Sequence, residues 1–320
     1  MTGDLPLTHR FQALGDATRL RILMLVAQVE LTVGEIAHVL GQSQPSISRH
    51  VRILDEAGLV RRRREGAWVF VEPARDTADY LLSGLIAGTA TADDEAVFAA
   101  DASRLAAVQR ERAEAAAIYF AERAEQWDTL RQLHVSETDV EAAMEGLVGS
   151  RPIGRLVDIG TGTGRMLEIF APRASDAIGI DRSPEMLRLA RVKLDEAGVT
   201  GASLRQGDMF ALPLPDDHAD TVILHLVLHF AATPGQVIAE AARILRPGGQ
   251  LLIADFAPHE REELRRQLKH QRLGFADDAM QRWFSAANLE GEAPLCLDGG
   301  ELSVNLWRAT YPPISRSEAA

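Results

Sequence analysis

Three glycines and three carboxylates carry the spacing in this sequence that could support chemistry. The glycines occupy every second position of the segment D-I-G-T-G-T-G, which runs from Asp158 to Gly164. Glycine adopts backbone conformations that other residues resist, and its lack of a Cβ lets a ligand approach the backbone closely. An apolar run precedes the segment, and an apolar run compatible with a helix follows it. The pattern predicts a strand, a tight turn and a helix that cradle a nucleotide-like ligand.

The spacing differs from a dinucleotide-binding fingerprint, which has the form G-x-G-x-x-G and seats a pyrophosphate on the helix N-terminus. Here the third glycine comes one residue earlier. Asp181 ends the next apolar run, 21 residues after Gly160, where its carboxylate can accept hydrogen bonds from ribose hydroxyls. Asp208 ends a third run. Because no phosphate-binding lysine accompanies these acids, they favour a cationic nucleoside without phosphates.

Together these motifs resemble the class I S-adenosyl-L-methionine (SAM) methyltransferases, in particular the ubiquinone/menaquinone-biosynthesis type, over roughly residues 111–311. The resemblance implies SAM as cofactor, S-adenosyl-L-homocysteine (SAH) as product and a small-molecule methyl acceptor. It also implies a lid over the cofactor, to which Tyr119, Phe120 and Trp127 are assigned. The cofactor-binding residues that it implies are Asp158, Gly160, Thr161, Gly162, Gly164, Asp181, Arg182, Met186, Asp208, Met209 and His225.

Two histidines, His225 and His229, lie in the segment L-H-L-V-L-H-F after a predicted buried strand. Either can be a general base at the acceptor site, and either can equally be a satisfied core histidine. A base is needed only if the acceptor is a hydroxyl or an acidic carbon, because the sulfonium carbon is already activated. The catalytic residue therefore stays unassigned between these candidates. Asp208 also has a structural alternative, since it could cap the segment that follows it.

A second cluster of chemically useful residues lies on a helix predicted between Ser43 and Gly58. Its apolar residues share one stripe at 100° per residue, which leaves short hydroxyls and arginines on the outer face. Arginine can fork onto guanine, and serine can contact a base or a phosphate. The strand that follows contains four consecutive arginines, 61–64, and pairs with residues 68–71 as a basic hairpin. The predicted DNA-binding residues are Gln44, Ser46, Ser48, Arg49, Arg52, Arg62 and Arg64, although the four arginines could instead be a solvated strand face.

Residues 11–71 resemble the ArsR-type winged helix-turn-helix regulators, most clearly in L-G-D-A-T-R-L-R-I-L from Leu14 and S-Q-P-S-I-S-R-H from Ser43. The resemblance implies binding to palindromic operator DNA as a homodimer. Many members of that family sense metals through a cysteine pair on the helix before the turn. The matching residues here, 30–36, contain no cysteine, so no metal site is predicted.

The composition of the chain limits the kinds of partner, site and location that we expect for it. The net charge is −12, yet residues 1–73 hold nine Arg against eight acids, so the acidic excess lies in the rest of the chain. The single cysteine, Cys296, excludes a disulfide framework and a thiolate cluster, and it makes arsenite an improbable acceptor. No apolar run reaches the length of a membrane span and the start lacks a basic leader. We therefore expect a soluble, cytoplasmic protein with no membrane partner.

The predicted architecture has two domains: an N-terminal α+β winged helix-turn-helix and a C-terminal α/β, Rossmann-like methyltransferase sheet of seven strands, the last antiparallel. The predicted boundaries are 1–90 for DNA binding and dimerisation, 91–134 for a helical connector and lid, 135–311 for the methyltransferase and 312–320 for a tail. The apolar residues around 80–86 form the predicted dimerisation helix, and residues 89–94 form a joint. Because apolar residues are widely spaced along the connector, its first half is predicted to be solvated. Three functions remain open. The leading one is a transcriptional regulator joined to an active methyltransferase. The second is a regulator whose C-terminal domain only senses SAM or SAH, and the third is an enzyme that dimerises through its N-terminal domain.

Overall fold

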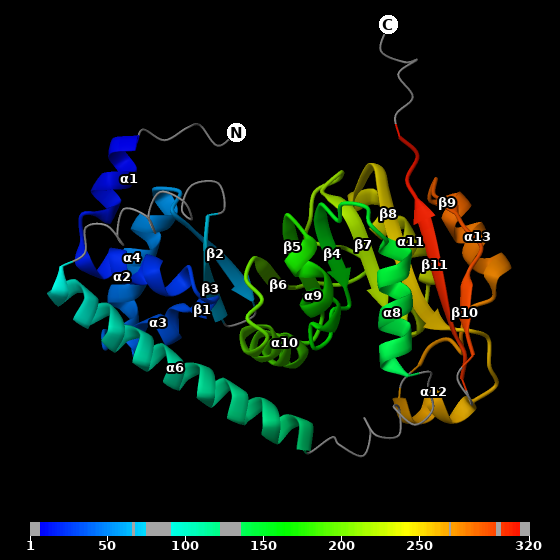
Figure 1. The fold of residues 1–320 in the computed structure, drawn as a ribbon, viewed down its shortest axis with the longest axis horizontal. Helices are drawn as coiled ribbons and strands as arrows, with labels where there is room; N and C mark the ends of the chain where they lie inside the picture. The colour runs from blue at the N-terminus through cyan, green and yellow to red at the C-terminus, as the bar shows by residue number, and fades with distance from the viewer. Residues whose placement is uncertain are drawn as a thin grey trace, which may run out of the picture. The chain divides into compact units, whose positions relative to one another are not determined.

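A computed structural model describes residues 7–65, 68–74, 91–121, 136–268, 270–298 and 302–313. The chain divides into two compact units, Met1–Ala115 and Ala116–Ala320 (Figure 1). The predicted dimerisation helix around residues 80–86, the first two residues of the predicted joint at 89–94 and the lid residue Trp127 lie outside the described residues. No helix in the described segments combines the length and apolarity needed to cross a bilayer.

The first unit has a helical core and a small antiparallel sheet with the strand order β1-β3-β2. Its elements are α1 (Leu7–Leu14), α2 (Ala17–Val26), β1 (Leu31–Thr32), α3 (Val33–Leu40), α4 (Gln44–Glu56), β2 (Val60–Glu65), β3 (Trp68–Pro73) and α6 (Ala92–Ala121). Local signals in the sequence account for the helix boundaries. Asp16 accepts a hydrogen bond from the backbone of Arg19, and Thr32 with Glu35 forms the predicted capping box.

Helix α4 buries the predicted stripe, since Ile47, Val51 and Leu54 are completely inaccessible to solvent. Ser43 occupies the N-cap position, but its side chain makes no capping hydrogen bond, contrary to the expectation from sequence. The neighbouring Ser46 hydroxyl instead donates to Gln42 at 3.3 Å. The start of α4 is therefore fixed by Pro45 in the first turn and by packing rather than by a serine cap.

Helix α6 packs against the winged unit over residues 101–112. Leu105 and Val108 are buried in the same core as α2, α3 and α4. Arg21 of α2 donates two hydrogen bonds to Asp101, at 2.6 and 2.7 Å. The interpretation of this part of α6 as a solvated connector is therefore wrong, because the apolar residues that looked widely spaced in sequence lie on one buried face.

The second unit is a sheet covered by helices on both faces. Its strands are β4 (Arg155–Ile159), β5 (Asp176–Asp181), β6 (Ala202–Gln206), β7 (Ala219–His225), β8 (Leu245–Phe256), β9 (Glu290–Gly291), β10 (Leu295–Leu297) and β11 (Val304–Thr310). Its helices are α8 (Glu137–Val148), α9 (Arg165–Phe170), η1 (Ala171–Arg173), α10 (Pro184–Glu196), η2 (Leu228–Phe230), α11 (Pro234–Ile244), α12 (Glu262–Leu268) and α13 (Asp277–Ala286).

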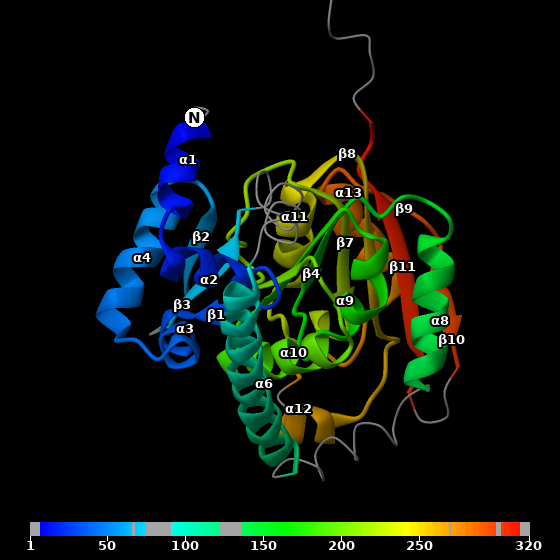
Figure 2. The ribbon, with the colours of Figure 1, turned by 60° about the vertical axis from the view of Figure 1, so that its left-hand side comes forward.

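The strand order is β10-β11-β8-β7-β4-β5-β6, with the two-residue β9 also paired to β11. Strands β4 to β8 are parallel, and β11 runs antiparallel to β8, as predicted for the last strand. One face packs on α8, α9 and α10 and the other on α11 and α13 (Figure 2). Cys296, the lone cysteine, is exposed on β10. The chain order of the parallel strands reverses between β4 and β7, which makes that gap the topological switch point where ligands bind in such sheets.

Candidate functional site

The glycine segment forms a tight turn from β4 into α9, and it does so with left-handed backbone at all three glycines. Their φ angles are +70° at Gly160, +53° at Gly162 and +82° at Gly164. A Cβ built on Gly160 would lie only 2.2 Å from Cγ2 of Val227, so no other residue fits without displacing the segment that follows β7. The predicted tight turn therefore lies at the carboxyl end of β4, and its glycines carry no Cβ that would keep a ligand away from the backbone.

Asp158, inside β4, is almost completely buried and accepts a hydrogen bond of 2.6 Å from the hydroxyl of Thr161. Desolvation raises the pKa of the Asp158 carboxyl to about 7, and the nearby carboxylate of Asp181 acts in the same direction. The hydrogen bond from Thr161 opposes this rise but does not cancel it. At neutral pH the carboxyl group of Asp158 is therefore close to the midpoint of its titration, so nearby charges decide whether it is ionised.

Asp181 ends β5 beside the cradle, as predicted. Its two oxygens accept hydrogen bonds from the backbone amides of Gly162 at 2.9 Å and Ser183 at 2.8 Å. Burial raises the pKa of this carboxyl. Each carboxylate oxygen has a second lone pair, so these contacts orient Asp181 and still leave capacity for a ribose hydroxyl. Arg182 is exposed, and the half-buried Met186 lies in the first turn of α10, which Ser183 caps.

Asp208 is exposed after β6, and one of its oxygens accepts a hydrogen bond of 3.0 Å from the backbone of Phe210. The capping alternative is thus realised in the structure, although one capped oxygen does not exclude a ligand contact. Met209 is half-buried and packs against the core on the α11 face. Asp158, Asp181 and Asp208 all lie at the carboxyl end of the parallel strands, so the acids that sequence spacing brought together do share one edge.

The two histidines after β7 have different environments. His225 is the last residue of β7 and is half-buried. Desolvation lowers the pKa of its imidazole to about 4, although the carboxylates of Asp255 and Glu141 act to raise it. His229, in contrast, is buried, and its Nδ1 lies 2.8 Å from Oδ1 of Asp255. His229 is therefore a core histidine whose ring is held by Asp255, as the structural alternative had it.

Asp255 was not among the residues singled out from sequence. It is the penultimate residue of β8, is completely buried, and accepts hydrogen bonds from the backbone amides of His229 and Phe256 at 3.1 and 2.8 Å. Its signal was present, since it ends an apolar run in the same way as Asp158 and Asp181 do. Leu226 was also missed. Its φ of +50° is unusual for leucine, and no local motif predicts it.

The outer face of α4 carries the side chains predicted to contact DNA. Gln44, Ser48, Arg49 and Arg52 are exposed, whereas Ser46 is half-buried. Arg52 makes only a loose ion pair of 3.7 Å with Glu56, and both side chains are more than half exposed. Such a pair contributes little to stability and does not hinder a contact to DNA.

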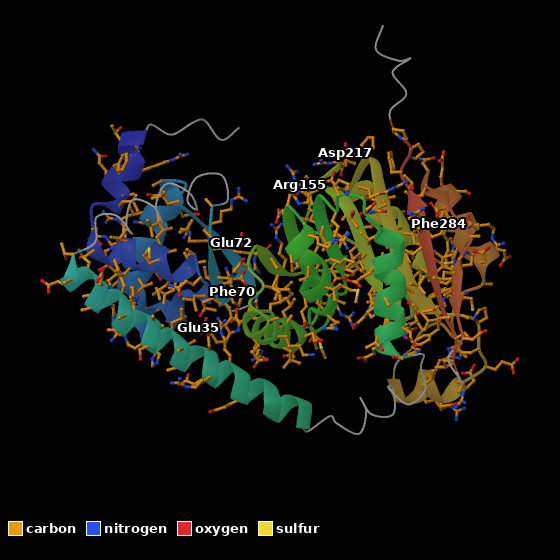
Figure 3. All side chains as sticks on the ribbon, in the orientation of Figure 1. Glu35, Phe70, Glu72, Arg155, Asp217 and Phe284 are labelled. Atoms are coloured by element: carbon orange, nitrogen blue, oxygen red, sulfur yellow. The ribbon has the colours of Figure 1, made fainter. Side chains whose placement is uncertain are left out.

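The hairpin of β2 and β3 forms as predicted, but its four arginines are not equivalent. Arg63 pairs with Glu30 and lies 5.2 Å from the ring centre of Phe70, so it is part of the fold (Figure 3). Arg62 is exposed and donates to Asp55 of α4 at 2.8 Å. Arg61 and Arg64 are exposed. The solvated-face alternative thus fails for Arg63, while the predicted contacts of Arg62 and Arg64 with DNA stay predictions.

The cysteine-free residues 30–36 contain a charged contact. Glu35 of α3, labelled in Figure 3, receives two hydrogen bonds of 2.8 Å from Arg112 of α6, and Arg112 also donates to the carbonyl of Glu30. These hydrogen bonds lower the pKa of Glu35 against the opposing effect of burial. No group of three or more His, Cys, Asp or Glu that could hold a metal ion occurs within the described ranges.

Comparison with known proteins divides the chain in the same way. Residues 16–62 match a family model described as bacterial regulatory protein, arsR family, and residues 157–253 match one described as methyltransferase domain. An uncharacterized methyltransferase, YcgJ, of Bacillus subtilis is 33% identical over 107 residues, which cover 33% of this chain and 42% of the relative. A phosphatidylethanolamine N-methyltransferase of Cereibacter sphaeroides is 38% identical over 103 residues, 32% of this chain and 50% of the relative.

A ubiquinone/menaquinone biosynthesis C-methyltransferase of Shewanella pealeana is 30% identical over 122 residues, 37% of this chain and 49% of that protein. The chain thus spans about half or less of the length of these curated relatives. Among solved structures, a putative methyltransferase from Bacillus halodurans superposes with a TM-score of 0.49 at 19% identity, covering 53% of this chain and 98% of that one. The family models establish that this chain joins an arsR-type helix-turn-helix to a methyltransferase domain.

Proposed function

We propose that this protein is a DNA-binding transcriptional regulator whose C-terminal domain is an active SAM-dependent methyltransferase that acts on a small molecule. The observation that supports the enzymatic half is the glycine cradle at the switch point between β4 and β7. Its three glycines all take positive φ angles, and a side chain on Gly160 would collide with Val227. We place the protein in the cytoplasm, where operator DNA and SAM are both present.

The residues at the cradle fit a sulfonium nucleoside. Asp181 would bind the ribose hydroxyls, the backbone of Gly160 and Gly162 would approach the amino-acid part, and Asp208 with Met209 would flank the base. The buried carboxyls of Asp158 and Asp181 favour a cationic ligand, because a positive charge nearby compensates the desolvation of a carboxylate. When bound, SAM supplies an activated methyl group, and the protein has only to align the acceptor with it and exclude water.

The exposed face of α4 supports the DNA-binding half. Ser48, Arg49 and Arg52 project from a helix whose other side is locked into the core, so the helix can enter a major groove without unfolding. We propose that the protein binds a palindromic operator as a homodimer, with Arg62 and Arg64 of the hairpin on the phosphates.

Two measurements test the proposal. Calorimetric titration of the full-length protein with SAM and SAH is expected to give binding that weakens in Asp181→Ala; equal affinity in the variant would contradict the ribose assignment. A gel shift on DNA upstream of the gene, against random DNA at the same salt concentration, is expected to show specific binding. Binding no better than to random DNA would favour the third function, in which the N-terminal domain only dimerises.

The contacts of α6 favour a further possibility, that cofactor occupancy changes operator affinity. Helix α6 is tied to α2 by Arg21 and Asp101 and to α3 by Arg112 and Glu35, and it continues beyond the boundary at residue 115. A change at its C-terminal end would therefore act on the helices that position α4. Measuring operator affinity without ligand, with SAM and with SAH tests this; a shift of about 5–150-fold is typical of coupled sites, and identical affinities would refute coupling. A shift without turnover on any acceptor would favour the pure sensor.

A further inference from the structure

The segment from His225 to His229 crosses the carboxyl ends of two neighbouring strands at the switch point. His225 ends β7, where it lies opposite Ala254 of β8, and the preceding Leu224 lies opposite Ile159 of β4. The chain then turns sharply at Leu226, whose φ is +50° and whose amide donates to the carbonyl of Ala254 at 2.8 Å. A strained backbone is maintained only where the surrounding structure enforces it. The side chain of His225 is thus presented at a defined position.

Two contacts hold this turn in place. Val227 fills the space above Gly160, so the turn packs directly on the glycine cradle. At the other end, Asp255 binds both the backbone amide and the imidazole Nδ1 of His229. The histidine turn, defined here as residues 225–229, is therefore fixed against the cradle at one point and against β8 at another. The role of His229 in this arrangement is structural, because its hydrogen bonds to Asp255 anchor the turn.

His225 differs from His229 in having no hydrogen bond to any described residue, and it remains half-buried. An imidazole placed between the cradle and β8, with no hydrogen-bond partner among the residues that the structure describes, is available to a ligand. Burial holds its pKa near 4, so the ring is neutral and can accept a hydrogen bond at physiological pH. The same edge carries Asp158, Asp181 and Asp255, and this concentration of carboxyl groups disfavours an anionic acceptor.

We infer that His225 is a catalytic residue rather than the cofactor-binding residue that the resemblance implies, and that the acceptor is an uncharged molecule whose nucleophile is a hydroxyl. The inference rests on the proposed methyltransferase function. A ring nitrogen of His225 accepts the hydrogen bond from the O–H group and thereby orients a lone pair of the hydroxyl oxygen toward the methyl group. As the new bond to carbon forms, the S–CH₃ bond breaks with its electron pair left on sulfur, and the proton passes to His225 and then to water.

The test measures SAH release by the full-length protein with a panel of phenols and alcohols, and with matched carboxylates. We expect transfer to the uncharged members only. His225→Ala is expected to lower kcat by about 10²–10⁴-fold, the usual range for a general base, while changing the affinity for SAM by less than about 3-fold. His225→Gln, which keeps a polar side chain of similar size, should retain more of the acceptor affinity and still lose kcat. The matched control is His38→Ala, an exposed histidine of the first unit.

The outcomes separate this inference from the proposed function. Wild-type protein that fails to bind SAM contradicts the proposed function, and the inference falls with it. Protein that binds SAM but methylates carboxylates overturns the inference alone, whereas protein that binds SAM and methylates no member of the panel overturns the inference together with the proposed enzymatic activity. A His225→Ala variant with unchanged kcat and an unchanged pH profile also overturns the inference alone. A purely structural role would lower the melting temperature of His225→Gln and reduce SAM binding in parallel with kcat, and this pattern would also overturn the inference.

Discussion

The winged unit and the methyltransferase unit use charge in opposite ways. In the winged unit, arginines such as Arg49 and Arg52 lie on the exposed face of α4, and the half-buried Arg63 and Arg112 are paired with acids. In the methyltransferase unit, carboxyl groups point inward at one edge of the sheet, and burial raises the pKa of Asp158 and Asp181. The first arrangement suits a large anionic partner that docks from outside, and the second suits a small cationic ligand that is enclosed.

This difference predicts where substitutions should act. Changes on the outer face of α4 should alter binding of a macromolecule while leaving the fold intact, because those side chains are not needed for packing. Changes at the sheet edge should alter folding and ligand binding together, because the same groups are buried and hydrogen-bonded. The predictions below are ordered by the size of the expected effect.

The largest effect is expected for Gly160→Ala. The new Cβ would lie 2.2 Å from Val227 on a backbone with φ of +70°, so overpacking and backbone strain add to about 3 kcal/mol or more. We expect SAM binding to fall below detection in calorimetry and the melting temperature to drop. Gly198→Ala is the matched control, since Gly198 has φ of +66° and no heavy atom within 4 Å of a new Cβ. Equal effects of both substitutions would show that strain alone, not the cradle, is responsible.

The next effect concerns the DNA-binding face. Arg49→Ala should weaken specific operator binding by about 1–3 kcal/mol if the guanidinium forks onto a guanine, with little change for random DNA. The exposed Arg188 of α10 provides the control, because Arg188→Ala removes the same charge from the methyltransferase unit. Dissociation constants measured at several salt concentrations would decide. A loss shared equally by operator and random DNA would assign Arg49 to a phosphate rather than a base.

Asp158→Asn should stabilise the ligand-free protein most at pH 8, less at pH 5 and not at pH 3. The folded-state pKa of Asp158, about 7, lies above the ordinary value of 3.8, so stability from this group is full at low pH and is lost as pH rises through that window. Asparagine carries no charge to bury, and its carbonyl can still accept the hydrogen bond from Thr161. The expected gain at pH 8 is about 1.4 kcal/mol for each unit of pKa shift, and it should shrink as pH falls. Melting curves at four pH values would measure it, and a pH-independent difference would refute the buried charge.

The smallest effect is expected in the winged unit. Glu35→Gln removes one charge of the pair with Arg112 and should cost about 1–2 kcal/mol of unfolding free energy, measured by urea denaturation. Because the pKa of Glu35 is lowered in the fold, this contribution is present above the unfolded pKa and disappears as pH falls through the folded value. The control is Glu56→Gln at the exposed pair with Arg52, where less than about 1 kcal/mol is expected. A larger loss at Glu56 would contradict the contrast between paired and exposed charges.

Sequence patterns predicted those features that depend on near neighbours in the chain. The capping box of Thr32 and Glu35, the buried stripe of α4 and the turn at Gly160 to Gly164 each arise within a few residues, where backbone geometry and helical period act directly. The alternation of strand and helix predicted a Rossmann-like sheet whose last strand is antiparallel, but not the order of its strands. These features were accordingly predicted together with the residues that form them.

Features that depend on distant residues were not predicted. Asp255 could be recognised as the partner of His229 only when β8 was placed beside β7, because 26 residues separate them. The burial of Leu105 and Val108 depends on α6 lying along the winged core, which composition alone had suggested to be solvated. Likewise, the sequence pattern offered His225 and His229 equally as general bases or as core histidines, and only the contact of His229 with Asp255 distinguishes them. Packing and desolvation, rather than residue type, set these roles.

The single thiol of this chain provides a reporter on one unit only. Cys296 is exposed on β10 of the methyltransferase unit, and the winged unit contains no cysteine that could react. A fluorophore attached there needs no engineered substitution, and its emission reports on the methyltransferase unit alone. Burial and the neighbouring Asp298 raise the pKa of the Cys296 thiol, so the thiolate that attacks a maleimide is scarce at neutral pH. Labelling should therefore be slow at pH 7 and accelerate with alkalinity, which allows the degree of modification to be controlled by pH and time.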